Sequence, residues 1–131
     1  MIVLDTKVVS ELLRPAPSKQ VEAWLALQDG AAVYFTAVGE AELRQGVAIL
    51  PAGKRRTALS KAIESILSED FRDRILPFDR AAALAYAAIA SERRAAGRPI
   101  SQFDCQIAAI ARAHEAASQY GRLQRLRDRR D

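Results

Sequence analysis

The first six residues of this 131-residue chain, Met-Ile-Val-Leu-Asp-Thr, constrain its fold more than any other stretch. Four apolar residues follow one another without alternation and end abruptly on a carboxylate, Asp5, and a hydroxyl, Thr6. An apolar run of this kind predicts a strand that is buried on both faces, as in the interior of a parallel sheet. A helix-like segment follows at once, over residues 8–14, so the chain begins as an α/β protein.

Asp5 stands at the carboxyl end of this predicted strand. In parallel α/β sheets that end faces the crevice where ligands bind. A carboxylate there is either held by hydrogen bonds or holds a cation, because burying it unpaired costs several kcal/mol, and about 20 kcal/mol in the ideal Born limit. An Asp that merely starts the following helix is the alternative interpretation. The strand alone leaves both interpretations open.

Composition indicates one ordinary globular domain. Half of the residues are hydrophobic and 27% are charged, and this length can bury a core without disulfides. The single cysteine, Cys105, excludes an intramolecular disulfide and indicates a reducing compartment. His114 is the only histidine, so a zinc site built from His and Cys is not expected. We expect a cytoplasmic protein, since no apolar stretch approaches a membrane span and the N-terminus lacks the features of a signal peptide.

The net charge of +4 comes mainly from the end of the chain. Residues 122–131 contain five Arg and two Asp. The basic charge is therefore largely a property of this tail, and it gives little support for a nucleic-acid surface on the rest of the chain.

Strand-like and helix-like segments alternate along the chain. Strands are predicted at residues 1–6, 32–36 and 74–78, and helices at 8–14, 18–28, 38–50, 59–67, 80–96 and 102–116, with a basic hinge at 54–56. This alternation predicts right-handed crossovers and an α/β domain, with a central parallel sheet flanked by helices on both faces. Pro77 places the third strand near an edge. We expect residues 1–117 to form the domain, without a C-terminal edge strand, and residues 118–131 to be a helical or disordered basic tail.

Three acidic residues stand where packing alone would not put them: Asp5, Glu42 and Asp104. Glu42 lies beside Leu43, about 100° from the predicted buried stripe of its helix, which places it at the margin of that stripe. Gly46, one turn later, leaves space next to this carboxylate. Asp104 falls in the first turn of the last predicted helix.

These three carboxylates would converge if the first turns of their helices gather at the carboxyl ends of the strands. Like charges that lie so close repel each other, and hard cations between them make the arrangement tolerable. Oxygen ligands favour Mg²⁺ or Mn²⁺. Such ions activate water and stabilise the leaving oxygen in an in-line phosphodiester displacement. The spacing therefore predicts metal-assisted hydrolysis.

Simpler interpretations of the acidic residues exist. Glu42 taken alone could be an exposed helix residue, and the helix dipole alone favours an acid at the position of Asp104. Asp79 has a similar placement but is expected to be a plain N-cap. Glu11 and Glu40 are expected to be solvated.

Several motifs stand in order along residues 1–114. They are Met-Ile-Val-Leu-Asp-Thr at 1–6, Ala-Glu-Leu-Arg at 41–44 with Gly46, Leu-Pro-Phe-Asp at 76–79, and Gly-Arg-Pro-Ile-Ser at 97–101, leading into Asp104 and Ile-Ala-Ala at 107–109. Together they resemble the PIN-domain toxins of bacterial type II toxin–antitoxin modules, the VapC family, and in particular its FitB-like branch.

The resemblance implies a PIN fold and a Mg²⁺- or Mn²⁺-dependent endoribonuclease. It also implies a homodimer, inhibition by a cognate antitoxin, and contact with operator DNA only through that antitoxin. By position, Asp5, Glu42 and Asp104 match the acidic metal-binding and catalytic residues of the family. Thr6 matches the hydroxyl that helps to shape the same site.

The chain departs from the family pattern in two places. Lys7 stands where the family usually has Asn; its cation could bind substrate phosphate or compete with the metal. A lysine at this position also disfavours a phosphatase of the haloacid-dehalogenase type, which needs a second Asp there. Beyond the last helix, residues 119–122 stand where the family usually carries a fourth acid, and the Arg-rich end suggests a frameshifted or degenerate tail. A catalytically impaired, antitoxin-binding PIN protein is therefore the alternative to an active ribonuclease.

Overall fold

The computed structural model describes residues 1–114 and contains a parallel sheet. Its strands, in spatial order, are β1 (Ile2–Val3), β2 (Val33–Thr36) and β3 (Ile75–Leu76). Ile2 pairs with Val33 and Phe35 with Ile75, both in parallel register. The predicted parallel sheet is confirmed, and among the strands of residues 1–114 β3 lies at an edge, as Pro77 suggested. The expected loss of a C-terminal edge strand and the tail at 118–131 fall outside the described residues.

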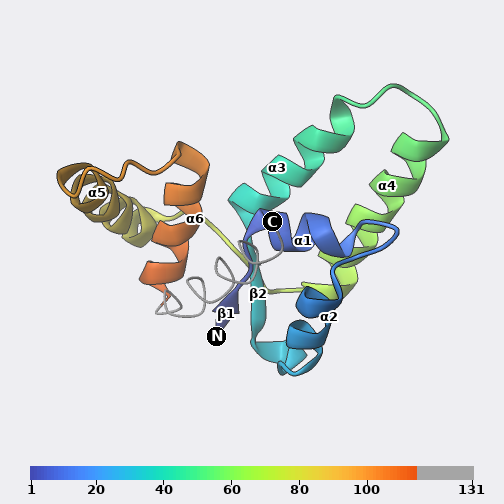
Figure 1. Cartoon of the computed structure of the whole chain (residues 1–131), viewed down its shortest axis with the longest axis horizontal. Coiled ribbons are helices and arrows are strands. Elements are labelled where there is room, and N and C mark those ends of the chain that lie inside the picture. The colour runs from blue at the N-terminus through green and yellow to red at the C-terminus, as the bar shows by residue number, and fades with distance from the viewer. Residues whose placement is uncertain (115–131) are drawn as a thin grey trace.

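Six α-helices surround this sheet within residues 1–114 (Figure 1). They are α1 (Thr6–Leu12), α2 (Lys19–Ala26), α3 (Ala37–Ala48), α4 (Lys54–Ser65), α5 (Arg80–Ala95) and α6 (Gln102–Ala113), with a 3₁₀ turn η1 (Gly30–Ala32) before β2 and a π-helical extension of α4, η2 (Ile66–Asp70). None of these helices is long and apolar enough to cross a membrane. Each predicted helix is present, with bounds shifted by a few residues.

The predicted basic hinge at residues 54–56 is wrong, because these residues form the first turn of α4. Gly53 is the N-cap of this helix. Lysine and arginine are good helix formers, so the helix extends back to Gly53, well before the apolar stripe that marks it in the sequence.

The helices form two layers, one on each side of the sheet (Figure 1). Ile2 and Leu4 of the first strand region pack into a core with residues of α1–α4 and η2, whereas Val3 packs on the other side with Ala111 of α6. Side chains of a strand alternate between its two faces, so β1 contributes to both layers. Val3 and Leu4 are fully buried, which confirms that this strand is covered on both faces.

Gly39 in the first turn of α3 permits an unusually close approach between α3, β2 and α1. A Cβ atom at this position would lie 2.4 Å from Cζ of Phe35 and 3.1 Å from Oγ1 of Thr6. Phe35 is fully buried and its ring stacks on Phe71, with 5.5 Å between ring centroids. The ring therefore has little room to move, and only glycine fits the space between it and α1.

We predict that Gly39→Ala destabilises the protein by about 1–3 kcal/mol, because the added methyl group overpacks a core site. Urea unfolding followed by circular dichroism measures this change. Gly46→Ala is the matched control in the same helix, since a Cβ there meets nothing within 4 Å and alanine favours the helix by roughly 0.5–1 kcal/mol. Equal effects of the two substitutions would contradict the packing argument.

Candidate functional site

Asp5 follows β1 and precedes α1. Its backbone is extended, and its carbonyl oxygen accepts a hydrogen bond from the N–H of Val8 at 3.0 Å. The carboxylate makes no capping hydrogen bond to the helix, although the residue is 98% buried, with 2% of its surface exposed. Asp5 therefore holds the N-cap position of α1 without using its side chain as a cap.

Thr6 connects the end of β1 to α3. Its hydroxyl donates a hydrogen bond to Oε1 of Glu42, with 2.7 Å between the two oxygens. Thr6 is buried and Glu42 is half-buried, while the neighbouring Leu43 is in the core. The predicted position of Glu42 at the margin of the buried stripe of α3 is confirmed. Two residues 36 positions apart in the sequence, which the family resemblance places in one site, are thus in direct contact.

Asp104 lies in the first turn of α6 and is half-buried. Its backbone N–H donates to Oγ of Ser101 at 3.2 Å, so Ser101 is the N-cap and the carboxylate of Asp104 does not serve as one. Helix α6 contacts α3, the helix that carries Glu42. Lys7, the residue after Thr6, is exposed on α1.

The donor atoms of this region are all oxygens: the carboxylates of Asp5, Glu42 and Asp104 and the hydroxyl of Thr6. Such a set suits a hard divalent cation. Between residues 1 and 114, however, no three or more His, Cys, Asp or Glu side chains are grouped closely enough to hold a metal ion. The donor chemistry therefore fits a metal, while the full convergence of the three acids stays a prediction.

Glu11, which is expected to be solvated, is instead buried. It is 6% exposed, and its carboxylate accepts the backbone N–H of Ser18 at 2.8 Å and pairs with Arg14 at 3.1 Å. The prolines at 15 and 17 turn the chain back over α1, and the hydrogen bond from Ser18 to Glu11 stabilises that turn. Glu40 is half-buried and pairs with Arg44 of the same helix, so it is less solvated than expected.

The expectation that Asp79 is a plain N-cap is confirmed. Asp79 caps α5 by accepting the N–H of Ala82 at 3.0 Å. His114 is the C-cap residue of α6. Cys105 is a buried small residue with 1% exposure, and burial raises the pKa of its thiol, which makes it a poor nucleophile.

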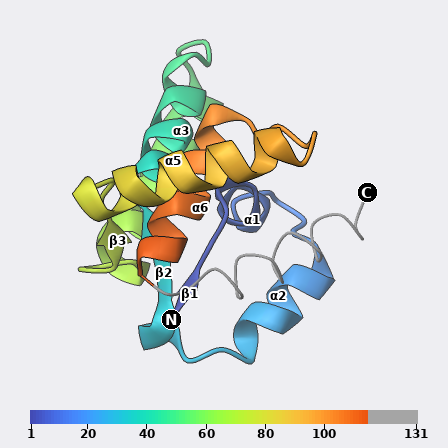
Figure 2. The ribbon, with the colours of Figure 1, turned by 90° about the vertical axis from the view of Figure 1, so that its left-hand side faces the viewer.

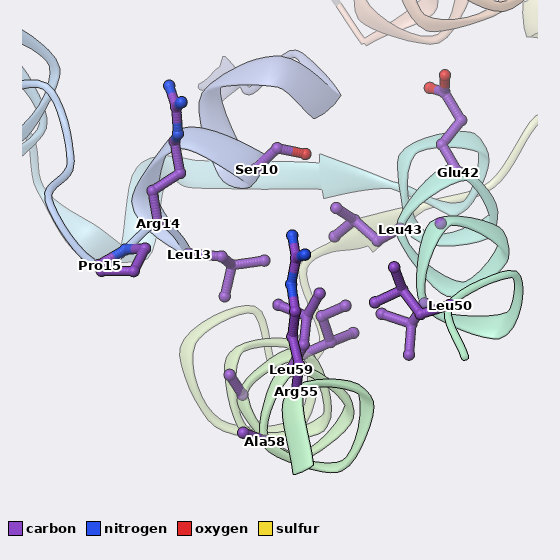
Figure 3. Close-up of a pocket in the computed structure, with 14 residues that line it drawn as sticks. Ser10, Leu13, Arg14, Pro15, Glu42, Leu43, Leu50, Arg55, Ala58 and Leu59 are labelled. Atoms are coloured by element: carbon purple, nitrogen blue, oxygen red, sulfur yellow. The ribbon is translucent and has the colours of Figure 1, made fainter. Parts of the chain in front are cut away.

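A groove of about 720 Å³ opens beside Glu42, between α1, α3 and α4. Figure 3 shows Glu42 on one wall, Ser10 and Arg14 on the opposite wall, and the side chain of Arg55 extending from α4 into the space between them. Gly46 lines the same groove and leaves open space, as its position in the sequence suggested. The groove itself was not predicted, because it depends on how α4 packs against α3.

Arg44 links α3 to α4, two of the helices that form this groove. It pairs with Glu40 of its own helix at 2.8 Å and with Glu64 of α4. The hydrogen bond to Glu64, followed by the one to Glu40, raises the pKa of Arg44, and the hydrogen bond from Arg44 lowers the pKa of Glu64. Because these side chains are exposed to solvent, the pairs orient α4 more than they stabilise the fold.

Comparison with known proteins identifies the family of this chain. The family model of the PIN domain matches residues 2–118, and the chain belongs to the PIN-domain family. It is 45% identical over 117 residues to Toxin FitB of Neisseria gonorrhoeae, covering 87% of this chain and 82% of that protein. It is 42% identical over 114 residues to VapC ribonuclease Y4jK of Sinorhizobium fredii, covering 87% and 81%.

A solved structure of FitAB bound to an IR36 DNA fragment has the same fold. Its matching chain superposes with a TM-score of 0.81 at 44% sequence identity, over 87% of this chain and 80% of that chain. The predicted resemblance to the FitB-like branch of the VapC toxins is thereby confirmed.

We predict that Thr6→Val destabilises the protein by about 1–2 kcal/mol, because a buried hydroxyl that donates to a carboxylate is lost. Urea unfolding measures the change. Thr6→Ser is the matched control: it keeps the hydroxyl and removes one methyl group, with an expected loss below about 1 kcal/mol. If the serine variant loses as much as the valine variant, methyl packing and not the bond to Glu42 accounts for the effect.

Proposed function

We propose that this chain is a Mg²⁺- or Mn²⁺-dependent endoribonuclease toxin of a toxin–antitoxin module. The observation that carries the proposal is the hydrogen bond from Thr6 to Glu42. It joins Thr6, which follows Asp5 at the carboxyl end of β1, to an acid on α3. The names of its relatives, a FitB toxin and a VapC ribonuclease, support the same activity.

In this proposal Asp5, Glu42 and Asp104 are the metal ligands and the catalytic acids. A bound Mg²⁺ or Mn²⁺ would supply an activated water and stabilise the leaving oxygen at an RNA phosphodiester. Thr6 occupies one lone pair of Oε1 of Glu42, which fixes the direction in which that carboxylate presents its remaining oxygen. Burial of Asp5 keeps bulk water away from one side of the site and strengthens its electrostatic interactions.

Lys7 is proposed to contact a substrate phosphate. It is exposed and follows Asp5 and Thr6 in the first turn of α1. It forms no ion pair with any residue of the region 1–114. An ammonium group in this position can attract the RNA backbone toward the acids.

The proposed partners are RNA as substrate, a cognate antitoxin as inhibitor, and a second copy of the chain in a homodimer. Operator DNA would be contacted only through the antitoxin, in the cytoplasm. The relative solved as FitAB with a DNA fragment supports this assembly.

A catalytically impaired PIN protein that binds an antitoxin is the second candidate. Lys7 favours it, since a cation beside the acids can compete with the metal. The lack of a grouped metal site within the first 114 residues favours it as well.

Loss of a residue that hydrogen-bonds to a metal ligand typically lowers activity by about 10- to 100-fold. Because Asp5 is proposed to be a ligand itself, we predict that Asp5→Asn lowers the rate of RNA cleavage by more than that. Purified, antitoxin-free protein is assayed with Mg²⁺ or Mn²⁺, and EDTA should abolish the activity. The matched control is Glu22→Gln, an exposed acid on α2. Melting curves with Mn²⁺ give a second readout, because a ligand that binds the native state raises the melting temperature and Asp5→Asn should lose that rise.

Wild-type cleavage by the Asp5→Asn variant would remove Asp5 from the site. A wild-type protein that binds Mn²⁺ but cleaves no RNA would favour the impaired, antitoxin-binding candidate.

Lys7→Ala should raise KM for RNA by about three- to tenfold with a small change in kcat, because a charge-assisted phosphate contact at an exposed position is lost. Lys19→Ala removes the same charge from an exposed position on α2 and should leave KM unchanged. Tighter Mn²⁺ binding by Lys7→Ala, with an unchanged KM, would instead mean that the lysine competes with the metal.

A further inference from the structure

The end of α5 and the connection to α6 carry a group of exposed arginines. Arg93 and Arg94 lie in the last turn of α5, and Arg98 lies in the connection. Nε of Arg93 donates to the carbonyl oxygen of Arg98 at 2.7 Å, which folds the connection back onto the helix. We call these three residues the α5-end cluster.

Nothing in the described part of the chain neutralises this cluster. None of its members forms an ion pair with residues 1–114, and the neighbouring acid, Glu92, pairs with Arg112 of α6 at 3.4 Å. Arginines in the last turn of a helix interact favourably with its dipole. That explanation does not extend to Arg98, which lies beyond the helix. Among residues 1–114 the cluster is therefore a concentrated positive charge without an ion-pair partner.

Phe103 lies in the first turn of α6, on the helical hairpin that consists of α5, the connection and α6. It directly precedes Asp104, one of the proposed metal ligands, and is 48% exposed. A partly exposed aromatic ring offers a face on which a nucleic-acid base can stack. Gln102 beside it is also exposed. The start of α6 thus places an aromatic surface next to an acid of the candidate site.

The cluster and the start of α6 are close in space. Helices α5 and α6 pack against each other, and Figure 2 shows α5 crossing in front of α6. Residues 96–101 join the end of α5 directly to the start of α6. Positive charge, an aromatic face and Asp104 are therefore neighbours on one hairpin.

We propose that the α5-end cluster and Phe103 form a binding surface for single-stranded RNA that leads the strand to Asp104. The arginines contact backbone phosphates, and Phe103 stacks on one base. Several unpaired cations next to an exposed ring are typical of single-stranded nucleic-acid sites, and charge complementarity favours a polyanion over a neutral protein surface. This inference rests on the proposed ribonuclease function, since it names the surface that receives the substrate.

The first test compares two double variants that remove the same charge. Arg94→Gln/Arg98→Gln removes two members of the cluster, and Arg72→Gln/Arg80→Gln removes two exposed arginines elsewhere, one of them at the opposite end of α5. Anisotropy of a fluorescein-labelled, mixed-sequence RNA oligonucleotide is measured with EDTA present, so that no cleavage occurs. In the cluster variant, each lost phosphate contact should reduce the slope of the logarithm of the RNA-binding constant against the logarithm of the salt concentration by about 0.7. The control variant should keep the wild-type slope.

The second test concerns stacking. Phe103→Ala should weaken RNA binding by about tenfold, and Phe103→Trp should retain it. Light scattering and near-UV circular dichroism on the same samples report oligomeric state and folding. If Phe103→Ala changes the oligomeric state and leaves RNA affinity unchanged, the residue belongs to a subunit interface and the proposal is overturned for it.

A polyglutamate peptide and a DNA strand of the same sequence serve as competitors. Displacement of the RNA by polyglutamate at equal charge concentration would show a surface for acidic protein segments and would overturn the RNA assignment, as would equal effects of the two double variants. The outcome is separable from that of the ribonuclease test. If RNA binding depends on the α5-end cluster while RNA cleavage is unchanged by Asp5→Asn, the result supports this surface and rejects the proposed catalytic acids.

Discussion

The close packing of Gly39 against Phe35 and Thr6 sets the distance between α3, the sheet and α1. The Phe35 ring is held between this glycine and Phe71, so α3 cannot shift without disturbing the core. At this distance the hydroxyl of Thr6 reaches the carboxylate of Glu42. A contact in the apolar core therefore determines the geometry of the polar site above it, and the two cannot vary independently.

The proposed site is built from three acids, on a protein whose net charge is positive. Asp5 is buried, Glu42 takes a hydrogen bond from Thr6, and Asp104 stands at the start of α6. The groove beside Glu42 adds Arg55, and the segment that leads into α6 and Asp104 adds the α5-end cluster. In the proposed function, basic groups near these acids would suit chemistry on a polyanion, because cations attract a phosphate backbone and carboxylates are ligands for a hard metal ion.

Local signals in the sequence predicted much of the fold. The apolar run at β1 predicted a strand buried on both faces, and Asp79 predicted the start of α5 through its cap. Pro77 predicted an edge strand. Burial of Glu11 was missed because its partner, the N–H of Ser18, comes from a turn whose direction no local pattern specifies. The first turn of α4 was missed because its basic residues carry no apolar periodicity.

By itself the sequence determined which segments form strands and helices, the parallel orientation of the strands, and the family to which the chain belongs, because these follow from periodicity, caps and motifs. Only the tertiary structure decided that Thr6 bonds to Glu42 across 36 positions, that Glu11 is buried, and that a groove opens between α1, α3 and α4. The physical reason is that these features arise where separate elements pack together. Packing distances depend on side chains from several elements at once, and no single segment encodes them.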